Sequence, residues 1–321
     1  MLCEYRFELK HPLLLPQAIP VWVSNLRFDF ERKQELLVAV KVAVHCNDSA
    51  MWPRIEAGSR DGVKADIYFP DPSYEDVFQV LLTFLALLSL RGWDAHWNEQ
   101  PPGRSWIAES DEESSAVKIN NYQISIGKLK APHDFPIRLN DLVQTALASG
   151  LARPLRQPLE FLQYATERHN ARRFIEAFQY FYFVIESLYG NGRSNQNQIL
   201  EAFMQSPRLR VKMRMALKHP TLYVREASDR TKYCAFVSAL TPRDAFMKLI
   251  KTRGQLHHHT LRSPLAWSLN SQGQFFEISA LSANVAMPLL FWECKKYLWG
   301  EDVLNQFEQI QASLSQGIPS A

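Results

Sequence analysis

The sequence has few cysteines, and none of them is placed where a metal site or a redox pair would need it. Cys3, Cys46, Cys234 and Cys294 are the only four in 321 residues, with no CxxC pair and no zinc-ligand spacing. We therefore expect reduced, buried thiols in a cytoplasmic protein. No metal ion and no other cofactor is expected.

The sequence also lacks a secretory signal and a membrane-spanning run. Charged residues interrupt the N-terminus before an apolar stretch develops: Glu4, Arg6, Glu8 and Lys10. The most apolar stretch, from Val77 to Leu90, is too short to cross a bilayer and contains Gln79, Thr83 and Ser89. It predicts a buried core helix in a protein that has no membrane partner.

Charge is distributed unevenly along the chain. Residues 1–150 carry 15 Lys and Arg against 20 Asp and Glu, a net charge of −5. Residues 151–321 carry the other 21 basic residues against 13 acidic ones, a net charge of +8. An anionic partner, if there is one, is expected to bind the C-terminal half. Ordinary solubility charge is the alternative interpretation.

The N-terminal half predicts a small α+β domain over residues 1–130. Tyr5 to Leu9 alternates apolar and charged residues, as a half-buried strand does. Short strands are expected around one central helix that begins after Ser73 and stops at Gly92. Residues 109–115 read as an acidic turn. This half contains no phosphate-binding glycine loop, no nucleophile motif and no metal cluster.

Three tryptophans of the N-terminal half, Trp93, Trp97 and Trp106, suggest either a ligand pocket or ordinary packing. The pocket would make the protein a small-ligand sensor, and packing is the commoner use of such residues. The sequence leaves both open.

The amino-acid composition changes at residues 131–158, where four prolines bracket a predicted helix at 140–149. We take this as a linker region, followed by an all-helical domain over residues 159–315. Its clearest helix runs from Phe174 to Tyr189, with aromatic residues at spacings of three and four. Glu186 lies inside this apolar stripe, as a rim residue or as the partner of an arginine.

The most basic part of the chain lies between residues 208 and 232. Its first helix carries five cations and no acid: Arg208, Arg210, Lys212, Arg214 and Lys218. Tyr223 and Tyr233 are interleaved with the cations that follow. Such a surface suits RNA, since cations bind phosphates and aromatic rings stack on unpaired bases. A solvated helix face is the alternative.

A histidine cluster follows an arginine near the end of another predicted helix, which starts with Thr241-Pro242. Arg253 precedes His257, His258 and His259 in the string Lys-Thr-Arg-Gly-Gln-Leu-His-His-His. In a regular helix His257 lies one turn after Arg253, while the next two histidines fan round by about 100° each. The three histidines are therefore not expected to share one metal ion.

The aromatic helix containing Phe-Tyr-Phe-Val-Ile-Glu-Ser-Leu and the later Arg-histidine string together resemble the HEPN superfamily. The likeness covers about residues 155–300. The nuclease motif of that family is an arginine, four to six residues, and a histidine. Arg253 to His258 has four intervening residues and Arg253 to His259 has five, whereas His257 is too close. The resemblance thus implies Arg253 and His258 as catalytic, His259 as second choice, and Glu186 and His257 as supporting.

By this resemblance we expect a metal-independent endoribonuclease that acts as a homodimer in a prokaryotic antiviral defence or toxin-like system. A trigger or regulatory protein would then bind the N-terminal domain. One residue departs from the family pattern: the position after the arginine is usually Asn, Asp or His in active members, and here it is Gly254. The alternative is a non-catalytic HEPN-like protein that binds RNA or acts as a scaffold. A purely structural alternative is a polar helix end with Arg253 in a salt bridge.

Overall fold

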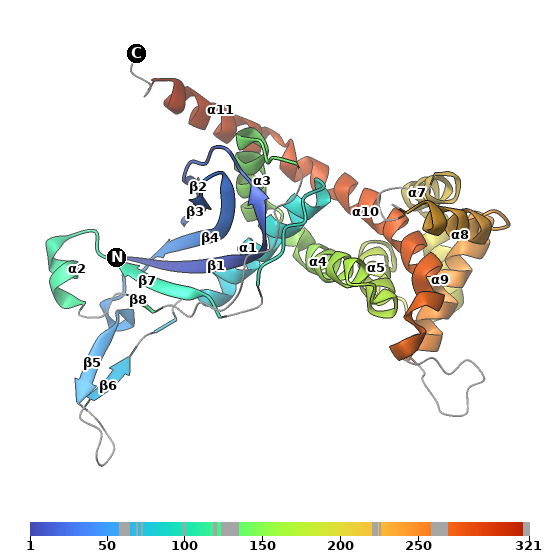
Figure 1. Ribbon diagram of the computed structural model, residues 1–321, viewed down its shortest axis with the longest axis horizontal. Helices are drawn as coiled ribbons and strands as arrows, with labels where there is room; N and C mark the ends of the chain where they lie inside the picture. Colours follow the sequence, from blue (N-terminus) through green and yellow to red (C-terminus); the bar gives the residue numbers. More distant parts are fainter. Residues whose placement is uncertain are drawn as a thin grey trace. The chain divides into compact units, whose positions relative to one another are not determined.

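The computed structural model describes residues 1–57, 65–68, 70–71, 73–98, 101–117, 121–122, 135–219, 224, 226–257 and 269–316. The chain divides into two units, Met1–Arg153 with Tyr297–Ala321, and Pro154–Lys296. The first unit is built on an antiparallel sheet and the second on helices alone (Figure 1). The predicted α+β fold, with a helical region after an N-terminal sheet, is confirmed.

The sheet of the first unit has six described strands in the order β2-β3-β4-β1-β7-β8. All of their pairings are antiparallel. The strands are β1 (Leu2–Leu14), β2 (Val21–Val23), β3 (Leu26–Lys33), β4 (Leu36–His45), β7 (Gly103–Ile107) and β8 (Asn121–Tyr122). A separate two-stranded ribbon pairs β5 (Arg54–Ala57) with β6 (Ala65–Tyr68).

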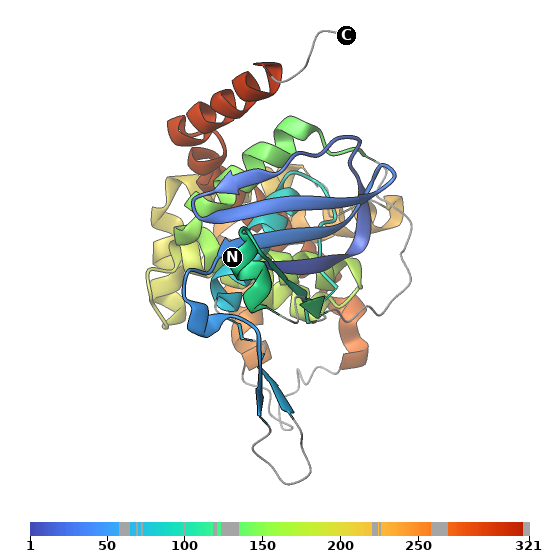
Figure 2. The ribbon, with the colours of Figure 1, turned by 90° about the vertical axis from the view of Figure 1, so that its left-hand side faces the viewer.

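The alternation predicted for the first strand is present in β1. Tyr5 and Phe7 are buried, whereas Arg6 and Glu8 between them are partly exposed. The buried face packs on α1 (Tyr74–Leu90), whose side chains are buried from Val80 to its end. Figure 2 shows the strands of the sheet in front of this helix. The fourteen-residue apolar run is therefore a core helix, as predicted.

The opposite face of the sheet carries ion pairs across neighbouring strands. The Arg6 guanidinium donates to both carboxylate oxygens of Glu31, at 2.8 and 2.9 Å. These hydrogen bonds lower the pKa of Glu31. Lys41 lies 3.5 Å from Glu4 and 3.7 Å from Glu31. The polar residues of the alternating pattern thus satisfy one another at the exposed face.

The boundary between the units differs from the predicted linker at 131–158. Helix α3 (Leu139–Leu151) belongs to the first unit, where it packs on α1 and β2. Arg91, at the end of α1, donates hydrogen bonds to Asp141 and Thr145 of α3. The α11 helix (Glu301–Gln316) falls almost wholly within the predicted helical domain of residues 159–315, but it packs on α3 of the first unit. Interactions distant in sequence decide this boundary, and local composition does not report them.

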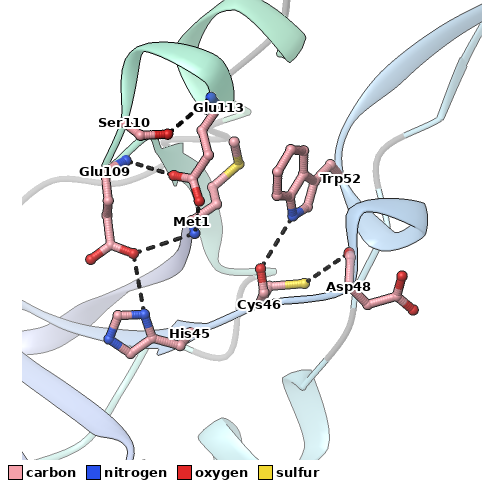
Figure 3. Close-up of polar contacts among 8 residues, drawn as sticks. All are labelled: Met1, His45, Cys46, Asp48, Trp52, Glu109, Ser110 and Glu113. Atoms are coloured by element: carbon pink, nitrogen blue, oxygen red, sulfur yellow. Dashed lines mark hydrogen bonds and ion pairs between the residues drawn. The ribbon is translucent and has the colours of Figure 1, made fainter.

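The predicted acidic turn at residues 109–115 contains the short helix α2 (Asp111–Ala116). Ser110 is its N-cap, and the serine hydroxyl accepts a hydrogen bond from the backbone N–H of Glu113 at 3.2 Å (Figure 3). Three acids in the first turn suit the positive end of the helix dipole. The acidic run was therefore a helix start and not a turn.

The second unit consists of seven α-helices with a short 3₁₀ segment, η3 (Leu269–Phe275), in its described part. The helices are α4 (Arg156–Asn170), α5 (Phe174–Tyr189), α6 (Gln196–Gln205), α7 (Pro207–Lys218), α8 (Ala227–Val237), α9 (Pro242–His257) and α10 (Phe276–Leu298, to residue 296). The stripe predicted for α5 forms its buried face, with Phe178, Phe181 and Tyr182 inaccessible to solvent. The α4 and α5 helices lie side by side (Figure 1).

One described helical segment, Ser271–Leu298, is apolar and long enough to cross a membrane by length and composition. However, 67% of its apolar window is buried in the protein, as in the core helix of a soluble protein. Pro288 lies inside α10. Burial of Leu289 and Leu290 next to it favours a continuous helix despite the missing backbone N–H.

Candidate functional site

Arg253 is carried by α9, and buried apolar residues fix that helix in the second unit. Ala245, Phe246, Leu249 and Ile250 are almost completely buried. The Phe246 ring packs against Phe203 of α6, with 5.5 Å between the ring centroids. This apolar face orients α9, and therefore Arg253, relative to α5 and α6.

The start of α9 is formed as the sequence predicts. The Thr241 hydroxyl accepts from the backbone N–H of Asp244 at 3.3 Å, and the Asp244 carboxylate accepts from the Thr241 N–H at 3.2 Å. This is a reciprocal capping box. Hydrogen bonds from the Thr241 side chain and backbone lower the pKa of Asp244. The N-terminus of α9, the helix that carries Arg253, is therefore stabilised by its capping residues.

The guanidinium of Arg253 is paired with the carboxylate of Glu186 on α5. The Nη2 and Oε2 atoms are 3.9 Å apart, and the two side chains are 32% and 23% exposed. At this separation the charges attract, but the distance is too long for a hydrogen bond. The Arg253 Nε is buried and has no hydrogen-bond partner among the described residues. Because Nε is buried, an anionic ligand would have to bind the other guanidinium nitrogens of this partly exposed side chain.

Tyr182 adds a third polar group beside this pair, one helical turn before Glu186 on α5. Its hydroxyl is buried and has no hydrogen-bond partner in the described part of the chain. Burial, and then the negative charge of Glu186, raises the pKa of Tyr182. The phenol therefore stays protonated at neutral pH. Tyr182, Glu186 and Arg253 form what we call the α5–α9 polar cluster.

Gly254 lies where α6 approaches α9. A Cβ atom at this position would come within 3.0 Å of Nε2 of Gln196, the first residue of α6. The glycine therefore leaves room for the Gln196 amide beside the α5–α9 polar cluster. The residue that departs from the family pattern has a local packing role here.

Of the three histidines predicted to act with Arg253, only His257 is among the described residues. His257 is the last residue of α9, four positions after Arg253. His258 and His259 lie outside the described residues. The pairing of Arg253 with His258, the second choice of His259 and the supporting role of His257 therefore stay predictions. Glu186, by contrast, is brought to Arg253 as the predicted arginine partner.

The five predicted RNA-binding cations lie on α7 but do not share one face. Leu209, Met213 and Ala216 form the buried face of this helix. At 100° per residue, Arg208 and Lys212 fall on one flank of that face and Arg210 on the other, whereas Arg214 and Lys218 point outward. Arg210 has a buried Nε that makes no hydrogen bond to any described residue.

Trp292 on α10 lies against the Arg208 flank, and it was not among the predicted site residues. The centroid of its ring is 5.2 Å from the Arg208 guanidinium carbon, 5.9 Å from the Lys212 Nζ and 5.5 Å from the Lys295 Nζ. The indole is 46% exposed. Lys295 and Lys296 follow Trp292 by three and four positions, which places them on the same side of a helix. This spacing was the sequence signal that could have indicated a cluster of cations around Trp292.

The structure bears on two questions that the sequence left open about aromatic residues. Tyr233 is completely buried and its hydroxyl donates to the backbone carbonyl of Ala216 at 2.8 Å, so it is a core residue and not a stacking surface. Trp106 is 97% buried, and Trp97 packs edge-on against Phe7 and Phe78. Trp106 is thus a core residue of the first unit and Trp97 packs at its partly exposed rim, which favours the packing interpretation of these two residues.

A second polar cluster joins the start of β1 to α2 in the first unit (Figure 3). The amino group of Met1 lies 2.6 Å from Glu113 and 3.3 Å from Glu109, and His45 Nδ1 lies 3.2 Å from Glu109. Among the described residues no group of three or more His, Cys, Asp or Glu is placed to hold a metal ion. We interpret this cluster as structural ion pairs that hold α2 against the start of β1.

No protein-family model, curated protein or solved structure significantly matches this chain. The resemblance to the HEPN superfamily therefore stays a prediction that depends on the sequence motifs alone.

Proposed function

We propose that the protein is a metal-independent endoribonuclease of the HEPN type that acts at Arg253. What supports this proposal is the position of Arg253, which is partly exposed on α9 and lies 3.9 Å from Glu186 on α5. This ion pair joins the two helices that the resemblance implicates. The same ion pair is expected by the purely structural alternative, and the cleavage experiment below decides between the two. Two copies of the chain would face each other to complete the cleft.

The proposed reaction needs only groups of the protein and the RNA. The ribose 2′-hydroxyl loses its proton and attacks the adjacent phosphorus, and the bond from phosphorus to the 5′ oxygen breaks. The products are a 2′,3′-cyclic phosphate and a 5′-hydroxyl, which takes up a proton. His258 transfers these protons near neutral pH, with His259 as the second candidate. Arg253 binds the phosphate oxygens and stabilises the charge that builds up on them.

The experiment incubates purified protein with single-stranded RNA in EDTA. Wild type should cleave, and Arg253→Ala and His258→Ala should each lose at least about a hundredfold in rate. Arg243→Ala is the matched control, because it removes the same charge from an exposed position in the first turn of α9. If wild type leaves RNA intact, or if all three variants cleave equally, the proposal is wrong.

An RNA-binding protein that does not cleave is the second candidate. Gly254 in the motif favours it, as do the cations around Trp292. Binding without cleavage, weakening steeply as salt increases, would select this alternative. Gly254→Asn restores the residue type of active family members, and cleavage gained by that variant would identify a lapsed nuclease.

The proposed setting is prokaryotic antiviral defence or a toxin-like system in the cytoplasm. The first unit would bind a trigger or regulatory protein. Co-purification of a partner by the full chain, lost when the charged face around Arg6 and Glu31 is neutralised, would support this assignment. If that variant retains the partner, the partner binds a different surface of the protein.

A further inference from the structure

Trp292 is a large aromatic side chain held at the surface by the register of its helix. Its neighbours Leu289, Leu290, Cys294 and Leu298 are completely buried and fix the inward face of α10. Trp292 consequently points away from that face, with 46% of its surface exposed. The apolar ring is available to a ligand at the same place where three cations gather.

The acidic residue next to Trp292 on α10, Glu293, is already neutralised. Glu293 accepts a hydrogen bond from Arg208 at 2.5 Å and another from the Tyr189 hydroxyl at 3.1 Å. Lys212 and Lys295 have no carboxylate partner within the described part of the chain. The surface around Trp292 therefore has uncompensated positive charge beside a flat ring.

The charge continues along α7. Arg214 and Lys218 are exposed on the outward side of this helix, which contains no acidic residue. On α10, Lys296 is exposed next to Lys295. We call Trp292, Arg208, Lys212 and Lys295 the Trp292 surface, with Arg214 and Lys218 as its extension.

We propose that the Trp292 surface binds single-stranded RNA, with one unpaired base stacked on the indole and the flanking phosphates bound by Lys212 and Lys295. The choice of RNA rests on the proposed function, whereas the stacking platform itself is independent of cleavage. Unpaired bases expose the π-faces that a tryptophan ring can contact, and their phosphates need cations at either side.

The charge pattern favours this ligand over a protein. A second copy of the chain would bring the same cations against themselves, which like-charge repulsion disfavours. An RNA duplex offers phosphates but keeps its bases stacked inside, so it would use the lysines and not the indole. The combination of ring and cations thus favours an unpaired strand.

The test measures binding by fluorescence anisotropy of a labelled single-stranded RNA of mixed sequence, in EDTA. The Arg253→Ala background removes the proposed cleavage from the measurement. Trp292→Leu should raise the Kd by about 5- to 100-fold with little change in salt dependence, whereas Trp292→Phe should retain most of the affinity. Lys212→Gln and Lys295→Gln should each lower the slope of log K against log salt by about 0.7.

Trp22→Leu is the matched control. Trp22 lies on β2 in the first unit, is also 46% exposed and also has an arginine nearby, with the Arg27 guanidinium carbon 6.0 Å from its ring centroid. This variant should bind RNA like its parent. Both tryptophan positions are exposed, so all variants should melt at the same temperature as the parent.

The possible failures are distinguishable. If wild type does not cleave but Trp292→Leu still weakens binding, the nuclease proposal fails and the stacking platform stands. If Trp292→Leu binds single-stranded RNA as tightly as its parent, the platform is wrong even for an active nuclease. Equal binding of an RNA duplex, or of polyglutamate, that does not depend on Trp292 would also overturn it. That result would indicate a general polyanion or acidic-protein surface.

Discussion

Nη2 of Arg253 lies 3.9 Å from Oε2 of Glu186, so the candidate reactive arginine on α9 is held beside the aromatic helix α5. Both side chains remain partly exposed. An ion pair at the surface contributes little to stability, typically below about 1 kcal/mol. The pair matters more for where it places the guanidinium than for the free energy of folding.

Glu186→Gln should therefore separate positioning from stability. We expect a change in the free energy of unfolding below about 1 kcal/mol, because the pair is partly exposed. RNA cleavage should fall about 10- to 100-fold, because Arg253 loses the charge that orients it. RNA affinity should hold or increase, since a negative charge is removed. The measurements are cleavage at saturating RNA and anisotropy in EDTA.

The matched control for that variant is Glu176→Gln on the same helix. Glu176 forms an ion pair with Arg173 at 2.6 Å, in the first turn of α5. It should leave cleavage unchanged. Full cleavage by Glu186→Gln, or an equal loss in the control, would contradict a positioning role for Glu186.

Gly254→Ala should stabilise the protein by about 0.5–1 kcal/mol, because alanine lowers the backbone entropy lost by glycine in a helix. The new Cβ would meet only the flexible end of Gln196, which can turn aside. Gly150→Ala in α3 is the contrast, because its Cβ would lie 2.4 Å from Cγ1 of Val23. Calorimetry should show the two substitutions shifting the melting temperature in opposite directions.

Tyr233 should make the second unit sensitive to alkaline pH. Burial raises the pKa of Tyr233 to about 12, above its ordinary value of 10. Because the folded protein holds the phenol proton more tightly than the unfolded chain, neutral Tyr233 stabilises the fold. This stabilisation is fully present below pH 10 and is lost as the pH rises through 12. Over that window the free energy of unfolding should fall by about 3 kcal/mol on account of this group.

Tyr233→Phe checks this assignment in urea denaturation at several pH values. The variant should lose about 1 kcal/mol at pH 7, because the hydrogen bond to the Ala216 carbonyl is missing. It should also show a shallower loss of stability between pH 10 and 12. An unchanged alkaline profile would mean that other groups control it.

Phe246→Ala should destabilise the protein by about 3–5 kcal/mol, because it removes a fully buried ring from the contact between α9 and α6. Met215→Ala on α7 is the surface control and should stay within about 0.5 kcal/mol, since Met215 is 49% exposed. Chemical denaturation measures both. Equal losses would show that Phe246 does not anchor α9.

Elements with strong local periodicity could be predicted from the sequence. The alternation in β1, the aromatic stripe of α5 and the Thr241 start of α9 all depend on neighbours within a few residues. The short helix α2 lies where a turn was predicted, and α11 belongs to the first unit although the sequence placed it in the helical domain. The first depends on the Ser110 cap and the second on packing against α3, which periodicity does not report.

The candidate site was predictable only in its parts. The motif spacing pointed to Arg253, and the apolar stripe marked Glu186 as a charge that needed a partner. That these two are the pair could not be known, because 66 positions separate them along the chain. Tyr233 and Trp292 illustrate the same limit, since one tyrosine among cations became core and one tryptophan in an apolar helix became surface.

The sequence by itself determined the α+β class, the helical C-terminal region and the residue types available for chemistry, because these follow from local periodicity and composition. Only the tertiary structure decided that Glu186 faces Arg253, that Gly254 makes room for Gln196, and that Arg208 and Lys212 meet Trp292. The physical reason is that helix rotation and pairing are set by the burial of whole apolar faces. Which polar residues then come together follows from that packing.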